Sequence, residues 1–272
     1  MNEPLSIKKM KINSFFKTLT LALFLLGTVT IIHAQNQQKE YYQLQTYTLA
    51  NEKQESMTDA YLKNAYLPAL KRMGIQNVGV FKMHSNNYVL SNKIYVLIPF
   101  SSLDKLYGLE QDLHKDELYN ESGKEYILAS YKQPPYERLN STILLAFDDM
   151  PKMAPSKVEG SRKDRIYELR SYESPTKTIF KNKVDMFNAG GEVTLFEELG
   201  FNAVFYAEVL SGDKMPNLMY MTTFTNKESR DKHWDAFRVA PKWKELSSMS
   251  KYQNNVSHID ITFLYPTEYS DY

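Results

Sequence analysis

A strand followed by a capped helix is the clearest pattern of hydrophobic and polar positions in this chain. Leu218–Phe224 is short, apolar and rich in Met, Tyr and Thr, which is typical of a β-strand. Thr225 and Glu228 then have the three-residue spacing of a capping box, in which two side chains bond backbone N–H groups at a helix start. Because proline cannot continue a helix, Pro241 should end this one.

Seven further segments have the alternating or continuous apolar pattern of strands. They are residues 41–47, 78–83, 94–100, 141–147, 166–172, 201–209 and 258–265. Between the first two, apolar positions recur at helical spacing from Leu62 to Met73. Pro68 lies inside this stripe, where we expect a kink or two short helices. Ser101 and Asp104 repeat the capping-box spacing before another helix.

The second half of the chain repeats the pattern of the first. Tyr42, Leu44 and Tyr47 correspond to Tyr167, Leu169 and Tyr172 at an offset of 125, and Phe100 corresponds to Phe224 at an offset of 124. An offset that stays so constant over several elements indicates an internal duplication. Each copy has the order strand, helix, strand, strand, helix, strand, which is the ferredoxin-like arrangement.

One such sheet, covered by helices on one side, leaves its other face bare, and two copies in one chain can cover each other. We therefore predict an α+β fold in which two tandem ferredoxin-like (βαββαβ) repeats form a pseudo-dimer similar to a dimeric α/β barrel. In the second copy Gly190-Gly191 interrupts the helix close to the position of Pro68 in the first. A bend is therefore expected in both copies.

The chain is expected to begin with a secretory signal peptide over residues 1–34. Four lysines precede an apolar run at residues 19–32, and Ala34 precedes a polar segment, which fits cleavage before Gln35. Met10 is an alternative start that leaves the signal complete. We predict a periplasmic or secreted protein without stable membrane insertion after cleavage. The predicted parts that follow are a first repeat at 35–147, a linker rich in Pro, Gly and charge at 148–165, and a second repeat at 166–272.

Composition excludes several classes of function. The 272 residues carry 33 basic and 32 acidic side chains without a basic run, so there is no footprint for nucleic acid or an anionic membrane. The chain has no cysteine, which excludes thiol chemistry and cysteine-ligated metals. We predict no metal site, because no HxxxH spacing joins His84, His114, His233 and His258. The GxSxG, GxGxxG and P-loop motifs are also missing.

The second copy resembles the NIPSNAP family. The motifs that carry the resemblance are IYELRSYESP, KVDMFNAGGEVTLFEELGF, VFYAEVL, MPNLMYMTTF, RDKHWDAF, PKW and FLYPTEYS, spread over residues 166–269. The resemblance implies a dimeric α/β-barrel fold, and it implies no established catalytic residues and no cofactor. The predicted signal peptide is a departure from the mitochondrial members of the family, so their organelle roles are not carried over.

Strand alternation predicts a polar site inside the barrel. If Leu169 points to the helices, Glu168 and Arg170 point into the barrel. On the neighbouring strands we expect Tyr206, Glu208 and Tyr220 to face the same space. Two interpretations stay open: a cross-sheet ion-pair network, or a ligand-binding pocket in which Arg170 holds an anionic or carbonyl group.

Three classes of function are compatible with these residues. The first is an exported protein that binds a small molecule in the barrel interior, and the second is an interaction module with a filled interior. A homo-oligomer is compatible with either. The alternative is a cofactor-light or haem-linked enzyme of the monooxygenase type, which rests on analogy of fold alone. Haem binding would distinguish this last class, whereas the residues themselves favour a protein without catalytic activity.

Overall fold

The computed structural model describes residues 38–272, except residue 86 and residues 88–91. The predicted signal peptide therefore lies outside the described residues. Among the helices that are described, none is long and apolar enough to cross a membrane.

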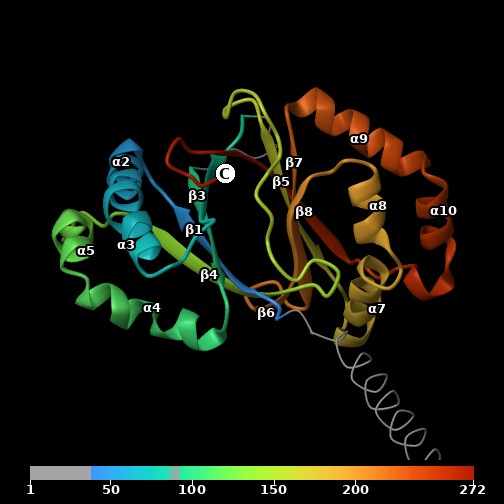
Figure 1. Ribbon diagram of the computed structural model, residues 1–272, viewed down its shortest axis with the longest axis horizontal. Helices are drawn as coiled ribbons and strands as arrows, with labels where there is room; N and C mark the ends of the chain where they lie inside the picture. Colours follow the sequence, from blue (N-terminus) through green and yellow to red (C-terminus); the bar gives the residue numbers. More distant parts are fainter. Residues whose placement is uncertain (1–37, 86, 88–91) are drawn as a thin grey trace, which may run out of the picture. The chain divides into compact units, whose positions relative to one another are not determined.

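Both halves of the chain fold into strands and helices in the same order (Figure 1). The first half contains β1 (Tyr41–Thr48), α2 (Glu52–Tyr61), the π-helical turn η1 (Leu62–Tyr66), α3 (Leu67–Arg72), β2 (Gly79–Met83), β3 (Lys93–Phe100), α4 (Leu103–Lys115), α5 (Glu117–Ser122), α6 (Lys124–Ile127) and β4 (Arg138–Ala146). The second half contains β5 (Ile166–Glu173), α7 (Lys177–Phe187), α8 (Glu192–Glu198), β6 (Ala203–Ser211), β7 (Asn217–Phe224), α9 (Lys227–Val239), α10 (Pro241–Ser248), the 3₁₀ turn η2 (Ser250–Tyr252) and β8 (His258–Pro266).

The strands form one closed antiparallel barrel in the order β1-β3-β2-β8-β5-β7-β6-β4. Each half contributes four adjacent strands, and the pairs β2–β8 and β4–β6 join the halves. The registers repeat: Leu44 of β1 lies opposite Thr142 of β4, and Leu169 of β5 lies opposite Thr262 of β8. The predicted fold of two tandem βαββαβ repeats in a barrel-like pseudo-dimer is confirmed.

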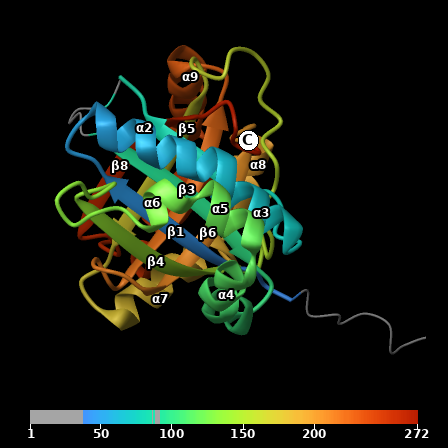
Figure 2. The ribbon, with the colours of Figure 1, turned by 90° about the vertical axis from the view of Figure 1, so that its left-hand side faces the viewer.

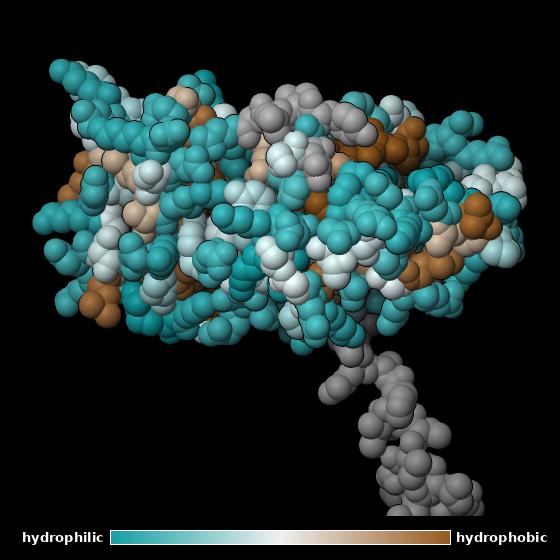
Figure 3. Space-filling view, turned by 90° about the horizontal axis from the view of Figure 1, so that it is seen from above, coloured by the Kyte–Doolittle hydropathy of each residue, from teal (hydrophilic) through white to brown (hydrophobic). Residues whose placement is uncertain are grey.

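Three apolar layers hold the barrel together. One fills the barrel and includes Leu44, Leu97, Leu169 and Leu264. The other two lie between the sheet and the helices, one in each half. Helices α2 to α5 cover the sheet of the first half and α7 to α10 that of the second (Figures 1 and 2). On the face shown in Figure 3 hydrophilic residues dominate, and the hydrophobic ones lie in small separate groups.

Of the two outcomes predicted for the first half, a kink or two short helices, the second is not found, whereas the break predicted for the second half is present. In the first half the helix runs without a break from α2 to α3, and Pro68 produces no separate helices. Instead the turn before it is π-helical, with the Leu67 N–H donating to the carbonyl of Leu62 five residues back. In the second half the predicted break is real, because Gly191, at φ 83°, has a left-handed backbone between α7 and α8.

The predicted capping residues are each wrong by one position. The residue that caps α9 is Asn226 rather than Thr225, and its side chain accepts from the Ser229 N–H. The residue that caps α4 is Ser102 rather than Ser101, and it accepts from the Lys105 N–H. Asn and Ser are both strong N-caps, so a run of such residues fixes a helix start only to within one position.

Candidate functional site

Glu168 and Arg170 face the helices, not the barrel interior, which corrects the prediction. Leu169 packs in the layer that fills the barrel. The neighbours of Leu169 in β5 therefore point outward, toward Trp234 of α9. Both faces of β5 are buried, so alternation alone could not decide which face was which.

The Glu168 carboxylate is completely buried and accepts hydrogen bonds from three side chains. Arg170 Nε donates at 2.7 Å, Trp234 Nε1 at 2.8 Å, and Arg230 donates through Nε at 2.8 Å and Nη2 at 2.7 Å. Burial alone would raise the pKa of the Glu168 carboxyl. The hydrogen bonds from Arg230 and the charge of Arg170 outweigh it, so this pKa lies below its usual value.

Arg170 links this carboxylate to a pair of tyrosines. Its Nη1 donates to Tyr172 Oη at 2.9 Å, and Tyr172 Oη lies 2.8 Å from Tyr220 Oη. The guanidinium also stacks on Trp234, with its carbon 3.8 Å from the ring centre. Glu168, Arg170 and Tyr220 thus come together as predicted, but as a hydrogen-bonded network between sheet and helix.

Tyr206 and Glu208 also lie on the helix side of the sheet, whereas the prediction placed them inside the barrel. The pairing of β6 is irregular near Val204, so Val204 faces the interior while Tyr206 packs in the helix layer. Tyr206 stacks on Tyr220 with ring centres 5.5 Å apart. Glu208 pairs with Leu218 of β7, which also packs in the helix layer, and takes no part in the network.

One end of the barrel interior holds a cavity with a polar wall, which we call the polar cup. The cup has a volume of about 240 Å³ and an apolar floor that includes Leu44, Leu169 and Met219. Its polar wall contains Thr46, Lys93, Asn140, Thr142, Ser171, Lys214, Asn217, Asp260 and Thr262. Lys214 lies in the loop between β6 and β7, and the others lie at the ends of β1 and β5 and near the starts of the strands paired with them. At the opposite end, Met153 and Tyr272 join the apolar layer that fills the barrel.

Among the polar groups of the cup that have no partner in the part of the chain that the structure describes, one atom of Asn217 and the Lys93 ammonium bear most directly on ligand binding. Asn217 is only 3% exposed; its Nδ2 donates to Ser171 Oγ at 2.9 Å, but its Oδ1 accepts no hydrogen bond. The Lys93 ammonium forms no hydrogen bond or ion pair within the described residues. By contrast, Lys214 pairs with Asp260 at the rim.

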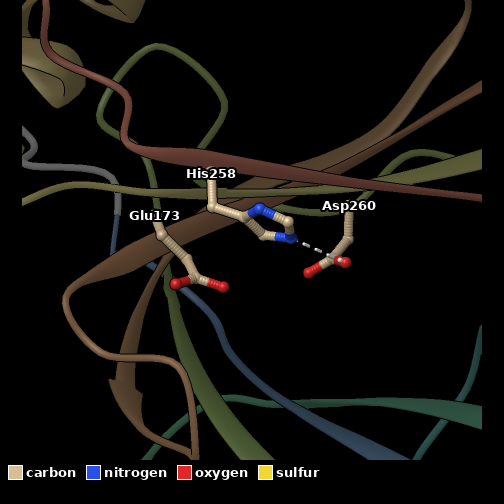
Figure 4. A group of neighbouring side chains, drawn as sticks. All are labelled: Glu173, His258 and Asp260. Atoms are coloured by element: carbon tan, nitrogen blue, oxygen red, sulfur yellow. Dashed lines mark hydrogen bonds and ion pairs between the residues drawn. The ribbon is translucent and has the colours of Figure 1, made fainter.

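Glu173, His258 and Asp260 form a cluster at the rim of the cup (Figure 4). One ligand atom of each lies within 4.8 Å of the others, and His258 Nε2 is 3.3 Å from Asp260 Oδ1. Glu173 ends β5 and pairs directly with His258, while Ser171 pairs with Asp260. A search for helical HxxxH spacing misses this group. The available signal was the HxD alternation at the start of a strand.

Charge is divided unevenly between the two halves at this end of the barrel. The shared register aligns Glu173, His258 and Asp260 of the second half with Thr48, Arg138 and Asn140 of the first. It likewise aligns Asn217 with Lys93. The rim is therefore acidic on the side of the second half and basic on the side of the first.

Comparisons with known proteins agree with the fold. Residues 167–271 match the model of the NIPSNAP family. A candidate monooxygenase from Fusobacterium nucleatum is similar over 85% of this chain and 93% of that chain, at 12% identity and a TM-score of 0.53. A second candidate monooxygenase, from Lactobacillus acidophilus, is similar over 84% and 94%, at 13% identity and a TM-score of 0.51. At such identities the likeness concerns the fold alone.

No curated protein sequence matches the chain. The family match covers β5 to β8 and the helices that pack on them. The matched segment includes the residues that hydrogen-bond to Glu168 and the acidic residues of the cup. The second half of this barrel is a NIPSNAP domain.

Proposed function

We propose that this protein binds a small polar molecule with an anionic group, such as a hydroxy or amino carboxylate, in the polar cup. The observation that carries the proposal is the Asn217 Oδ1 atom, a buried acceptor in the cup wall that no described residue satisfies. A buried polar group without a partner costs about 1–3 kcal/mol. A ligand O–H or N–H that donates to this atom would remove the cost.

The remaining groups of the cup define the ligand. The Lys93 ammonium, which has no anionic partner within the described part of the chain, would attract a carboxylate. Asp260 on the opposite side favours a hydroxyl or an ammonium group. The floor beneath them is apolar, and the volume lies below the roughly 300–1,000 Å³ typical of drug-sized ligands, so the molecule should be small.

The Glu168 network supports the choice of the cup over the site first predicted. All the hydrogen-bonding partners of Glu168 are supplied by the protein itself, so a ligand would have to replace existing bonds there. The cup, in contrast, contains groups that still need partners. The face shown in Figure 3 is mainly hydrophilic and gives no support to an interaction module that would dock there.

Native mass spectrometry and thermal shift test this proposal together. The protein purified from its host should retain a small mass, or should melt at a higher temperature with millimolar hydroxy or amino carboxylates such as lactate and serine. Asn217→Leu and Lys93→Met should each abolish the effect. Lys157→Met, which changes a lysine in a separate cavity, is the matched control. An effect that survives both cup variants, or no effect with any probe, would contradict the proposal.

We also propose that the mature protein is exported. The supporting observation is the sequence of residues 1–34, with lysines, an apolar run and a small residue before a polar segment. N-terminal sequencing of protein recovered outside the cytoplasm should start at Gln35. An intact N-terminus on membrane-bound material would show an anchor instead.

A further inference from the structure

We propose that Glu173, His258 and Asp260 bind one divalent transition-metal ion, such as Zn²⁺, at the rim of the polar cup. One imidazole and two carboxylates form a donor set that suits Zn²⁺ and its neighbours. Bonds of about 2.1 Å in a tetrahedral site place ligand atoms about 3.4 Å apart. The 3.3 Å between His258 Nε2 and Asp260 Oδ1 matches that spacing.

The backbone holds these three side chains in position. His258 and Asp260 are two residues apart in β8, so they share the face that lines the cup. Glu173 lies directly opposite His258 in the ladder between β5 and β8. In Figure 4 the imidazole lies between the two carboxylates, with its Nε2 directed to Asp260. Ligands on paired strands of a closed barrel need little rearrangement to bind an ion.

A second observation points to a ligand beside this cluster. Asn217 lies opposite Glu173 in the ladder between β5 and β7, and it lines the same cavity as Asp260. Its Oδ1 is buried and accepts no hydrogen bond from the described residues. A metal ion bound by three protein ligands keeps an open position for water, and such a water could donate to this oxygen. The cluster and the unsatisfied amide are thus parts of one arrangement.

Lys214 competes with the metal for Asp260. Its ammonium pairs with Asp260 Oδ2, while Oδ1 of the same carboxylate faces His258. The Lys214 side chain is 42% exposed, so it can turn into solvent when an ion binds. Removal of this lysine should therefore strengthen metal binding, whereas removal of a ligand should weaken it.

The site should bind a single ion per chain. The equivalent positions of the first half are Thr48, Arg138 and Asn140, which supply neither a carboxylate nor an imidazole. The inference goes beyond the proposed small-molecule ligand. Both proposals use Asn217 and Asp260, but Lys93 belongs to the carboxylate site alone, and Glu173 and His258 belong to the metal site alone. The two proposals can therefore fail separately.

Isothermal titration calorimetry of the untagged protein with ZnCl₂ tests the inference. We expect one ion per chain in the wild type. His258→Gln and Glu173→Gln should each weaken binding about tenfold or more, and Lys214→Met should strengthen it. His114→Gln, which removes an exposed histidine on α4, is the matched control and should leave binding unchanged.

A spectroscopic measurement separates a built site from loose surface binding. Co²⁺ added in place of Zn²⁺ should give a visible absorption band that disappears in His258→Gln. Circular dichroism should show that each variant stays folded, since His258 is 59% exposed. Absence of binding, or binding with the same affinity in His258→Gln and Glu173→Gln, would overturn the inference. Zinc binding that persists in Asn217→Leu would leave it intact even if no small-molecule ligand is found.

Discussion

At the scale of single residues, the two halves place different polar side chains at equivalent positions between the sheet and the helices. Where the second half has Glu168 and Arg170, the first has Gln43 and Gln45, and Gln45 donates to Tyr66 Oη at 3.2 Å. Neutral amides therefore suffice between sheet and helix, and the fold does not require charges there. A buried ion pair by itself is weak evidence of stability, although the loss of one partner is costly.

The carboxylate of Glu168 is the residue on which the network depends. Glu168→Gln should lower the free energy of unfolding by about 3–5 kcal/mol, because the buried Arg170 guanidinium then lacks its anion and Arg230 keeps only Asp231. Urea denaturation would measure the change. Glu228→Gln, which breaks an exposed pair with Lys232 on α9, should leave the midpoint unchanged. A Glu168→Gln variant as stable as the wild type would show that the network is dispensable.

The sequence predicted which of these residues are polar and close together, but it could not orient them. Glu168, Arg170 and Tyr220 were assigned to one face correctly, since their spacing and strand order require it. The choice of face was wrong because both faces of the strand are buried: Tyr167 and Leu169 are as well buried as the polar positions that alternate with them. Trp234 and Arg230, which bond Glu168 on the helix side of the sheet, decide its orientation, and both lie more than 60 residues from Glu168 in sequence.

At the scale of elements, the eight predicted strands are all present, with ends that shift by a few residues. Alternation over six to nine residues is a strong signal, whereas helix ends depend on one or two side chains. The π-helical turn before Pro68 and the irregular pairing near Val204 have no signal of that kind. The group formed by Glu173, His258 and Asp260 also escaped prediction, because it needs the β5–β8 register, which only the closed barrel defines.

Two glycines in the helical regions should respond to alanine in opposite ways. Gly191 has φ 83°, and an added Cβ would lie 2.9 Å from Lys242 Nζ. Gly191→Ala should therefore lower the free energy of unfolding by about 1–2 kcal/mol. Gly108 lies inside α4, and nothing lies within 4 Å of an added Cβ, so Gly108→Ala should raise stability by about 0.5–1 kcal/mol.

Thermal and urea unfolding of the two alanine variants, compared with the wild type, would check this contrast. The pair is matched because each change adds one methyl group to a glycine next to or within a helix. Equal effects of the same sign would show that the left-handed backbone between α7 and α8 accepts alanine as readily as glycine at position 191.

At the scale of the whole molecule, neither half has a closed sheet of its own. The interior layer is built from both halves, with Leu44 and Leu97 from the first facing Leu169 and Leu264 from the second. A separate half would expose its part of this layer to water, together with the strand edges that now pair as β2–β8 and β4–β6.

Residues 35–147 and 166–272 expressed separately should therefore lack a cooperative unfolding transition. Near-ultraviolet circular dichroism during heating would show this as a shallow, continuous change, while the intact protein gives a sharp transition. Mixing the halves should restore part of the sharp transition. A steep transition in either half alone would mean that its sheet is stable without the other.

The covalent link between the halves has a consequence for how the protein behaves at low abundance. A barrel assembled from two separate chains obeys mass action, so dilution favours dissociation and loss of any site at its mouth. Here β2–β8 and β4–β6 join parts of one polypeptide, and closure of the barrel is a unimolecular step. Dilution to trace concentrations would therefore leave the cup assembled.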